Sequence, residues 1–137
     1  MRQYVALAFL GLNPDEVTAA VGVSPTDAHR AGDERAPGVV WRHHYWRLKS
    51  GVAEEEIDAA THFAALFTKL EPRLTAIREL ADRCAPVVNW VVHVGPDERT
   101  PAGSIPRVIL GKCCDIGADL DVDMYFDAGS GFVETGP

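Results

Sequence analysis

The chain has 137 residues, with 13 basic and 20 acidic side chains and a net charge of −7. A chain of this length buries about two-thirds of the surface that its unfolded form exposes, so one domain over residues 1–137 needs no disulfide or metal for stability. A hydrophobic fraction of 47% and a charged fraction of 24% exclude a disordered chain and a membrane-spanning one. The acidic balance disfavours nucleic acid and anionic lipid as partners, and nothing in the composition demands a cofactor.

The first apolar run and the cysteines indicate the compartment. The run from Val5 to Leu10 is too short to span a bilayer, and no small-residue cleavage pattern follows it. The three cysteines, Cys84, Cys113 and Cys114, cannot form an even disulfide framework. We therefore expect a cytoplasmic protein with no export signal and no membrane segment.

A strand and a short helix are predicted at the start of the chain. Residues 4–12 form an apolar strand, and Asn13 and Pro14 follow as a helix cap and a first helical residue. Gly22 supplies the left-handed residue that ends this helix.

The next segment is predicted to be irregular and then extended. Residues 23–38 contain Pro and Gly turn signals without a sustained apolar period, which predicts a long ordered loop. Residues 39–48 are rich in branched and aromatic side chains, which predicts a strand.

Residues 53–84 carry the clearest helical period in the sequence. Apolar residues recur in steps of three and four, at Ile57, Ala60, Ala64, Phe67, Leu70, Leu74, Ile77 and Ala81. Pro72 lies inside this pattern and removes a backbone donor, so we expect a kink or two helices that meet near Glu71.

The last third of the chain predicts two further strands around a helix. Residues 87–94 form an apolar strand, a short strand is possible near Ile105, and a helix runs from about Pro106 to Ile116. In residues 119–127 apolar and acidic side chains alternate, which is typical of a strand. Residues 128–137 are expected to form a flexible tail. The element order predicts an α+β two-layer sandwich, with a mainly antiparallel four- or five-stranded sheet and helices on one face.

The order of these landmarks resembles a known family. The likeness is carried by a strand followed by Asn13-Pro14-Asp15-Glu16-Val17, then Val21-Gly22-Val23-Ser24-Pro25-Thr26, Gly32-Asp33, a Trp-containing strand, Leu70-Glu71-Pro72, and Ile116-Gly117-Ala118-Asp119-Leu120-Asp121-Val122-Asp123-Met124-Tyr125-Phe126. Together they are similar to the bacterial domain of unknown function 4279 over nearly the whole chain. The resemblance implies a small cytoplasmic bacterial α+β domain, and it carries over no catalytic residues because the family has no established activity. The family often has an aromatic residue where this chain has His29, so the resemblance gives no stacking role to that position.

Alternating aspartates at the end of the chain suggest a metal site at first sight. Asp119, Asp121 and Asp123 match the opening of a calcium loop, but that loop needs glycine at its sixth position and glutamate at its twelfth, where this chain has Met124 and Ser130. Alternate side chains of a strand lie about 6.5–7 Å apart, too far to enclose one ion. We interpret the series as a solvated strand face that discourages edge pairing, and we predict no metal site.

No catalytic motif is present in the sequence. It contains no Gly-x-Ser-x-Gly elbow, no phosphate-binding Gly-rich loop, no His-Glu-x-x-His and no Cys-x-x-Cys. The five histidines are not at recognisable spacings from a nucleophile, so we predict that the protein is not an enzyme.

The most informative feature is a charge asymmetry. Residues 24–50 carry five basic and three acidic side chains, a charge of +2, so the remainder of the chain carries −9. The same segment holds three histidines, two tryptophans and a tyrosine, a composition that suits an anionic partner or cation–aromatic contacts at an interface. The candidate binding residues are Thr26, His29, Arg30, Asp33, Arg42, His44 and Trp46. The alternative stays open that Asp33 bonds turn backbone, the tryptophans are core and the arginines pair with nearby carboxylates.

Two functions of different kinds follow from this segment. The first is a non-enzymatic protein-interaction domain, such as an immunity or regulatory protein that blocks a charged site on its target. The alternative is a small-molecule or anion-binding sensor that uses residues 24–50, with Arg30, Arg42 and His44 around the ligand. An enzyme with a scattered site that includes His43 or His44 is a weaker third possibility, and a homodimer through an exposed sheet edge is compatible with the sequence.

Overall fold

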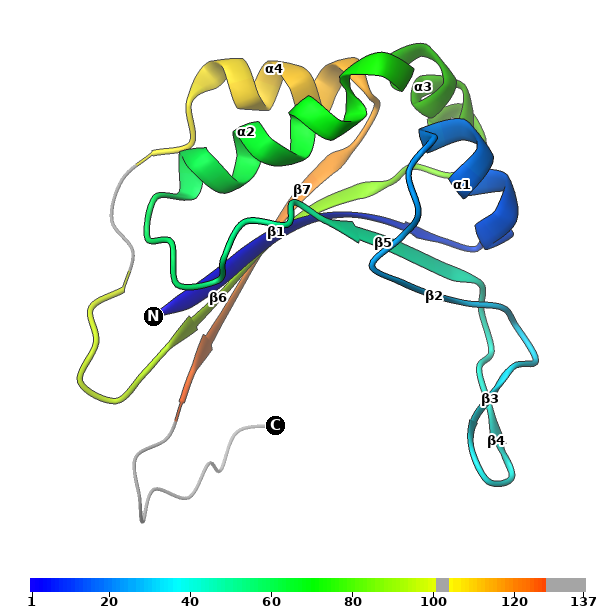
Figure 1. Cartoon of the computed structure of the whole chain (residues 1–137), viewed down its shortest axis with the longest axis horizontal. Helices are drawn as coiled ribbons and strands as arrows, with labels where there is room; N and C mark the ends of the chain where they lie inside the picture. The colour runs from blue at the N-terminus through cyan, green and yellow to red at the C-terminus, as the bar shows by residue number, and fades with distance from the viewer. Residues whose placement is uncertain (101–103, 128–137) are drawn as a thin grey trace.

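The computed structural model describes residues 1–100 and 104–127 and shows a sheet with helices packed against one face (Figure 1). The sheet has five strands in the order β2-β5-β1-β6-β7. Its strands are β1 (Arg2–Leu10), β2 (Asp27–His29), β5 (Tyr45–Lys49), β6 (Val87–Val94) and β7 (Asp119–Phe126). Neighbouring strands are antiparallel except β6 and β7, which run parallel. The predicted α+β sandwich is therefore confirmed, whereas the predicted tail, 128–137, lies outside the described residues.

The helices cover one face of the sheet and form the hydrophobic core with it (Figure 1). They are α1 (Pro14–Val21), α2 (Ala59–Leu70), α3 (Leu74–Arg83) and α4 (Arg107–Asp115), and a 3-10 turn, η1 (Glu71–Arg73), joins α2 to α3. Their buried residues pack on strand side chains that alternate toward them, such as Phe9, Trp46 and Val88. No helix in residues 1–100 or 104–127 is long and apolar enough to cross a membrane.

The local signals at α1 act as predicted. The Asn13 side chain accepts a hydrogen bond from the Asp15 amide at 2.9 Å, and Gly22 ends the helix with a φ of +74°. Since this conformation is strained for residues that carry a Cβ, glycine is favoured there.

The long helical segment is broken at Pro72 as predicted, but its start was predicted wrongly. Residues 53–58 are not helical, and α2 begins after Asp58, whose carboxylate accepts from the Ala60 amide at 3.3 Å. Ile57 is 73% exposed and is therefore not part of the buried stripe.

A buried polar network explains why residues 53–58 are not helical. The Gln3 and His62 side chains are both fully buried, and each has a nitrogen 2.8 Å from the Glu56 carbonyl oxygen. The Gln3 amide nitrogen of the backbone donates to the Glu54 carbonyl at 2.8 Å, and the Trp90 indole donates to Gln3 Oε1 at 2.8 Å. A helix through residues 53–58 would use these carbonyls internally and leave buried polar groups unpaired, so tertiary contacts override the apolar period.

Two further predictions in the middle of the chain were wrong. Residues 23–38 are not a loop throughout, because they contain β2 and β3 (Glu34–Ala36). The predicted strand over residues 39–48 is interrupted, since only β4 (Val39–Val40) and β5 are extended. The β3–β4 hairpin projects from the end of the sheet, away from the helices (Figure 1). Residues 104–106 contain no strand, so the possible strand near Ile105 is wrong as well.

Candidate functional site

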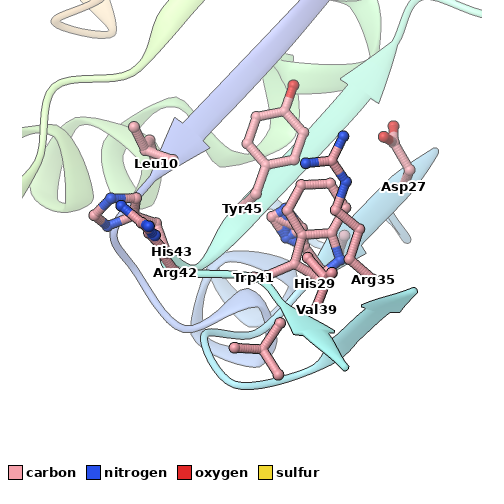
Figure 2. Close-up of a pocket in the computed structure, with 11 residues that line it drawn as sticks. Leu10, Asp27, His29, Arg35, Val39, Trp41, Arg42, His43 and Tyr45 are labelled. Carbon is pink, nitrogen blue, oxygen red and sulfur yellow. The ribbon is translucent and has the colours of Figure 1, made fainter. Parts of the chain in front are cut away.

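A cavity of about 780 Å³ lies where the β3–β4 hairpin meets the ends of β1, β2 and β5 (Figure 2). Its lining comes from edge strand β2, the hairpin, the stretch from Trp41 to Tyr45 and the end of β1. The lining residues are Leu10, Asp27, Ala28, His29, Arg35, Val39, Val40, Trp41, Arg42, His43 and Tyr45. The cavity therefore belongs to the basic, aromatic segment that the sequence singled out.

Four planar side chains form one wall of the cavity. The His29 ring stacks on the Trp41 ring with centroids 3.7 Å apart and an interplanar angle of 23°. Tyr45 lies on β5 directly opposite His29 and its ring is 5.3 Å from the imidazole. The Arg35 guanidinium lies 4.9 Å from the Trp41 ring centroid, a cation–π distance. These contacts connect the hairpin to β2 and β5.

The positive charges around the cavity are only partly neutralised. The Asp27 carboxylate is held by Arg47, at 2.7 Å from Nε and 3.1 Å from Nη2, so it does not compensate the lining cations. Arg35 and Arg42 have no ion pair with any carboxylate in residues 1–100 or 104–127. The electrostatic balance of the cavity therefore favours an anion.

Burial sets apart two polar groups of the wall, the Tyr45 phenol and the His29 imidazole. Burial raises the pKa of Tyr45, although the nearby Arg47 charge opposes that rise, so the phenol remains a neutral hydrogen-bond donor at physiological pH. His29 Nδ1 is buried and has no hydrogen-bond partner among the described residues. Unpaired buried nitrogens are uncommon in folded proteins and are found at functional sites as well as in structural positions.

The structure brings only two of the seven predicted binding residues to the cavity, His29 and Arg42. Trp46 lies in the core and not in the cavity wall. Its side chain is 0% exposed, it makes an edge contact with Phe9 at 6.3 Å, and its indole donates to Thr18 Oγ1 at 3.0 Å. It lies on the opposite face of β5 from Tyr45 and Arg47, because successive strand residues point to opposite faces.

The four other predicted residues hold the loop rather than line the cavity. Thr26 Oγ1 accepts from the Lys49 amide at 2.8 Å, and Asp33 Oδ2 accepts from the Arg30 amide at 2.8 Å. The Arg30 guanidinium pairs with Asp15 on α1 at 2.5 Å, and this contact raises the pKa of Arg30. His44 Nδ1 accepts from the Ala31 amide at 3.1 Å.

A protein-family model described as "Domain of unknown function (DUF4279)" matches residues 2–127. The chain belongs to the DUF4279 family. This assignment confirms the resemblance noted from the sequence. No curated protein and no solved structure matches the chain.

His29 has a stacking role in this DUF4279 chain. No stacking role was predicted for His29, yet its imidazole is the central ring between Trp41 and Tyr45. Sequence reasoning also missed Arg35, Val39 and Val40, which lie on the hairpin. A pair of valines exposed beside a Pro-Gly turn was the available signal for a hairpin with an apolar flank.

The cysteines of α4 and the alternating aspartates lie away from the cavity. No group of three or more His, Cys, Asp or Glu side chains within the described ranges could hold a metal ion. Cys113 is buried, and burial raises its pKa, whereas Cys114 is exposed. These thiols lie on α4, and the alternating aspartates lie on β7 at the far edge of the sheet.

Proposed function

We propose that this DUF4279 chain is a non-enzymatic interaction domain in the bacterial cytoplasm, and that its cavity holds an anionic group with an apolar body, presented by a partner protein. The observation that carries this proposal is the pair of guanidiniums, Arg35 and Arg42, that flank a stacked aromatic wall and have no carboxylate partner among the described residues. Guanidinium groups bind carboxylates and phosphates with two parallel hydrogen bonds, and the rings provide area for apolar contact.

The rim of the cavity favours a protein over a free metabolite. Leu10, Val39 and Val40 are each about half exposed there, and they adjoin Trp41 and Arg42. Exposed aliphatic residues beside tryptophan and arginine are typical of the energetic centre of a protein interface. An immunity or regulatory protein that blocks a charged site on its target is the form of interaction that this surface suits.

A second candidate, a sensor of a free small anion, rests on the cavity volume. About 780 Å³ falls within the range of roughly 300–1,000 Å³ that is usual for small-ligand sites. The same residues would bind the anion, so the two candidates differ in the source of the ligand and not in its chemistry.

Two matched probe pairs separate these candidates. The peptide acetyl-Glu-Phe-Glu-amide and its glutamine analogue represent a partner segment, and phenylacetate and phenylacetamide represent a free ligand. Binding is measured by calorimetry and by quenching of tryptophan fluorescence, because Trp41 lies in the cavity wall. The variants are Arg42→Ala, Trp41→Ala and the control Arg107→Ala, whose residue is exposed on α4.

We expect the acidic peptide to bind more tightly than its glutamine analogue. Loss of a charge-assisted contact in Arg42→Ala should weaken binding by about tenfold or more, whereas Arg107→Ala should change it less than twofold. Equal binding of the acidic and neutral peptides, or equal losses in Arg42→Ala and Arg107→Ala, would refute the proposal. Phenylacetate binding at least as tight as that of the peptide would favour the sensor.

A further inference from the structure

Strand β7 forms the outer edge of the sheet opposite β2, and one side of its backbone is unpaired among the described residues. The amides of Asp119 and Asp127 donate to β6-side carbonyls, those of Pro86 and Val94, at 3.1 and 2.8 Å. In a parallel ladder the residues that bond to one neighbour alternate with those that face away from it. The N–H and C=O groups of Leu120, Val122, Met124 and Phe126 therefore point to the free edge.

The two faces of β7 have opposite chemistry. Asp119, Asp121 and Asp123 lie on the face without helices, and none of them has an ion pair within residues 1–100 or 104–127. On the helix face, Leu120 joins the core, whereas Val122 and Phe126 farther along the strand are exposed, Phe126 by 64%. An open edge strand with exposed apolar side chains is a template for pairing with another chain. The aspartates of β7 discourage pairing with acidic or neutral strands, as expected from the sequence, and leave a basic strand as the compatible partner.

We propose that the free edge of β7 pairs with an extended strand of a partner protein in which basic residues alternate with apolar ones. The backbone of such a strand would bond to the outward N–H and C=O groups, as in β-strand addition. Its basic side chains would lie opposite the three aspartates on the open face, because side chains on one face of a strand recur every two residues in both strands. The Cβ atoms of directly opposite residues would be about 4.5–5.5 Å apart. Its apolar side chains would cover Val122, Met124 and Phe126 on the other face.

The same aspartates disfavour a second copy of this chain as the occupant. In a continuous antiparallel sheet, two β7 strands would be related by a two-fold axis perpendicular to the sheet. The aspartates of both copies would then lie on the same face and opposite one another. Like charges directly opposite one another are destabilising. A basic strand therefore fits where a homodimer through this edge does not.

The β7 edge is remote from the proposed cavity, which lies at the β2 end of the sheet, so the two proposals are independent. Failure of one leaves the other standing, because the cavity variants and the β7 variants share no residue.

The test uses three synthetic seven-residue peptides and the full chain. The first alternates lysine with valine and threonine, the second has glutamate in place of lysine, and the third is the lysine peptide with N-methyl groups on alternate amides. Methylation blocks edge pairing and keeps the charge. The variants are Asp121→Asn, Asp121→Lys and the control Asp82→Lys, which makes the same change in net charge on an exposed site of α3.

Binding is followed by calorimetry, and amide hydrogen exchange by NMR gives the position of the peptide. We expect the lysine peptide alone to bind, with new protection of the Val122 and Met124 amides. Asp121→Asn should weaken binding about two- to fivefold and Asp121→Lys at least tenfold, whereas Asp82→Lys should have less than a twofold effect.

Several results would overturn the proposal. Binding of the methylated peptide as tightly as its parent would show attraction by charge without strand pairing, and equal losses in Asp121→Lys and Asp82→Lys would show an effect of net charge. Failure of the lysine peptide to bind contradicts it directly. A concentration-dependent dimer that protects the Val122 amide would make a second copy the occupant, and peptide binding only after removal of residues 128–137 would make the chain's own C-terminal segment the occupant.

Discussion

The hydrogen bonds of the buried Gln3 side chain should contribute measurably to the stability of the protein. Gln3 donates to the Glu56 carbonyl and accepts from the Trp90 indole, both at 2.8 Å, and it is 0% exposed. In Gln3→Leu the Glu56 carbonyl keeps its contact with His62, but the indole N–H loses its partner. A buried donor left unpaired costs about 1–3 kcal/mol. We therefore expect Gln3→Leu to lower the free energy of unfolding by about 2 kcal/mol, which corresponds to a fall in Tm of roughly 6 °C for a domain of this size.

A double-mutant cycle with Trp90→Phe tests the cause of this loss. Trp90→Phe alone leaves Gln3 Oε1 without its donor, so it too should be destabilising. Replacing both partners by apolar groups removes the unpaired atoms, and the double variant should be more stable than the sum of the single effects predicts by about 1 kcal/mol or more. Urea denaturation of the four proteins gives the coupling energy. Additive effects within about 0.5 kcal/mol would refute the assignment of this hydrogen bond as the stabilising element.

Three further predictions follow from burial. Trp46→Ala should lower the free energy of unfolding by about 3–5 kcal/mol, because it empties a core position, whereas Trp41→Ala should lower it by about 1 kcal/mol. Urea denaturation measures both values, and similar losses would contradict the assignment of one ring to the core and the other to the cavity. Exposed Cys114 should react with a thiol reagent in the folded protein, whereas Cys113, whose pKa is raised by burial, should react only on unfolding; mass spectrometry of the labelled peptides decides this, and early labelling of Cys113 would refute it. Burial raises the pKa of Tyr45 above its ordinary value of 10.0, so its contribution to stability is complete below pH 10 and is lost as the pH rises through the folded pKa; Tyr45→Phe should reduce this alkaline loss in denaturation curves, and an unchanged pH dependence would contradict it.

Local signals sufficed to predict the regular elements that local chemistry controls. The cap at Asn13, the glycine at Gly22 and the break at Pro72 each act within one turn of a helix, and each lies where the sequence indicates. Strands β6 and β7 were also predictable, because their apolar residues either run continuously or alternate over eight positions.

Errors occurred where a residue distant in the sequence decides the outcome. Residues 53–58 have a helical period, but Gln3 and His62 bind their carbonyls from elsewhere in the chain. Strand β2 has three residues and no apolar period, and it exists because Arg47 and Tyr45 offer it a partner strand. The pattern of apolar residues in a short stretch of sequence contains no information about contacts with residues that are distant in the chain.

The candidate site shows the same division between composition and contact. The charge of +2 on residues 24–50 equals the number of guanidiniums in that segment, two, that have no ion pair among the described residues. The agreement is a coincidence of numbers, because most of the ion pairs join the segment to residues outside it. Arg30 pairs with Asp15 and Lys49 with Glu54, both outside the segment, and only Arg47 pairs within it, with Asp27. The Asp33 carboxylate accepts from the Arg30 amide, before the hairpin, and the Glu34 carboxylate accepts from the Gly38 amide in the hairpin turn. The sequence could therefore locate the basic segment, but it selected Arg30 and missed Arg35, since which arginine remains free depends on contacts with α1 and β2 that composition does not record.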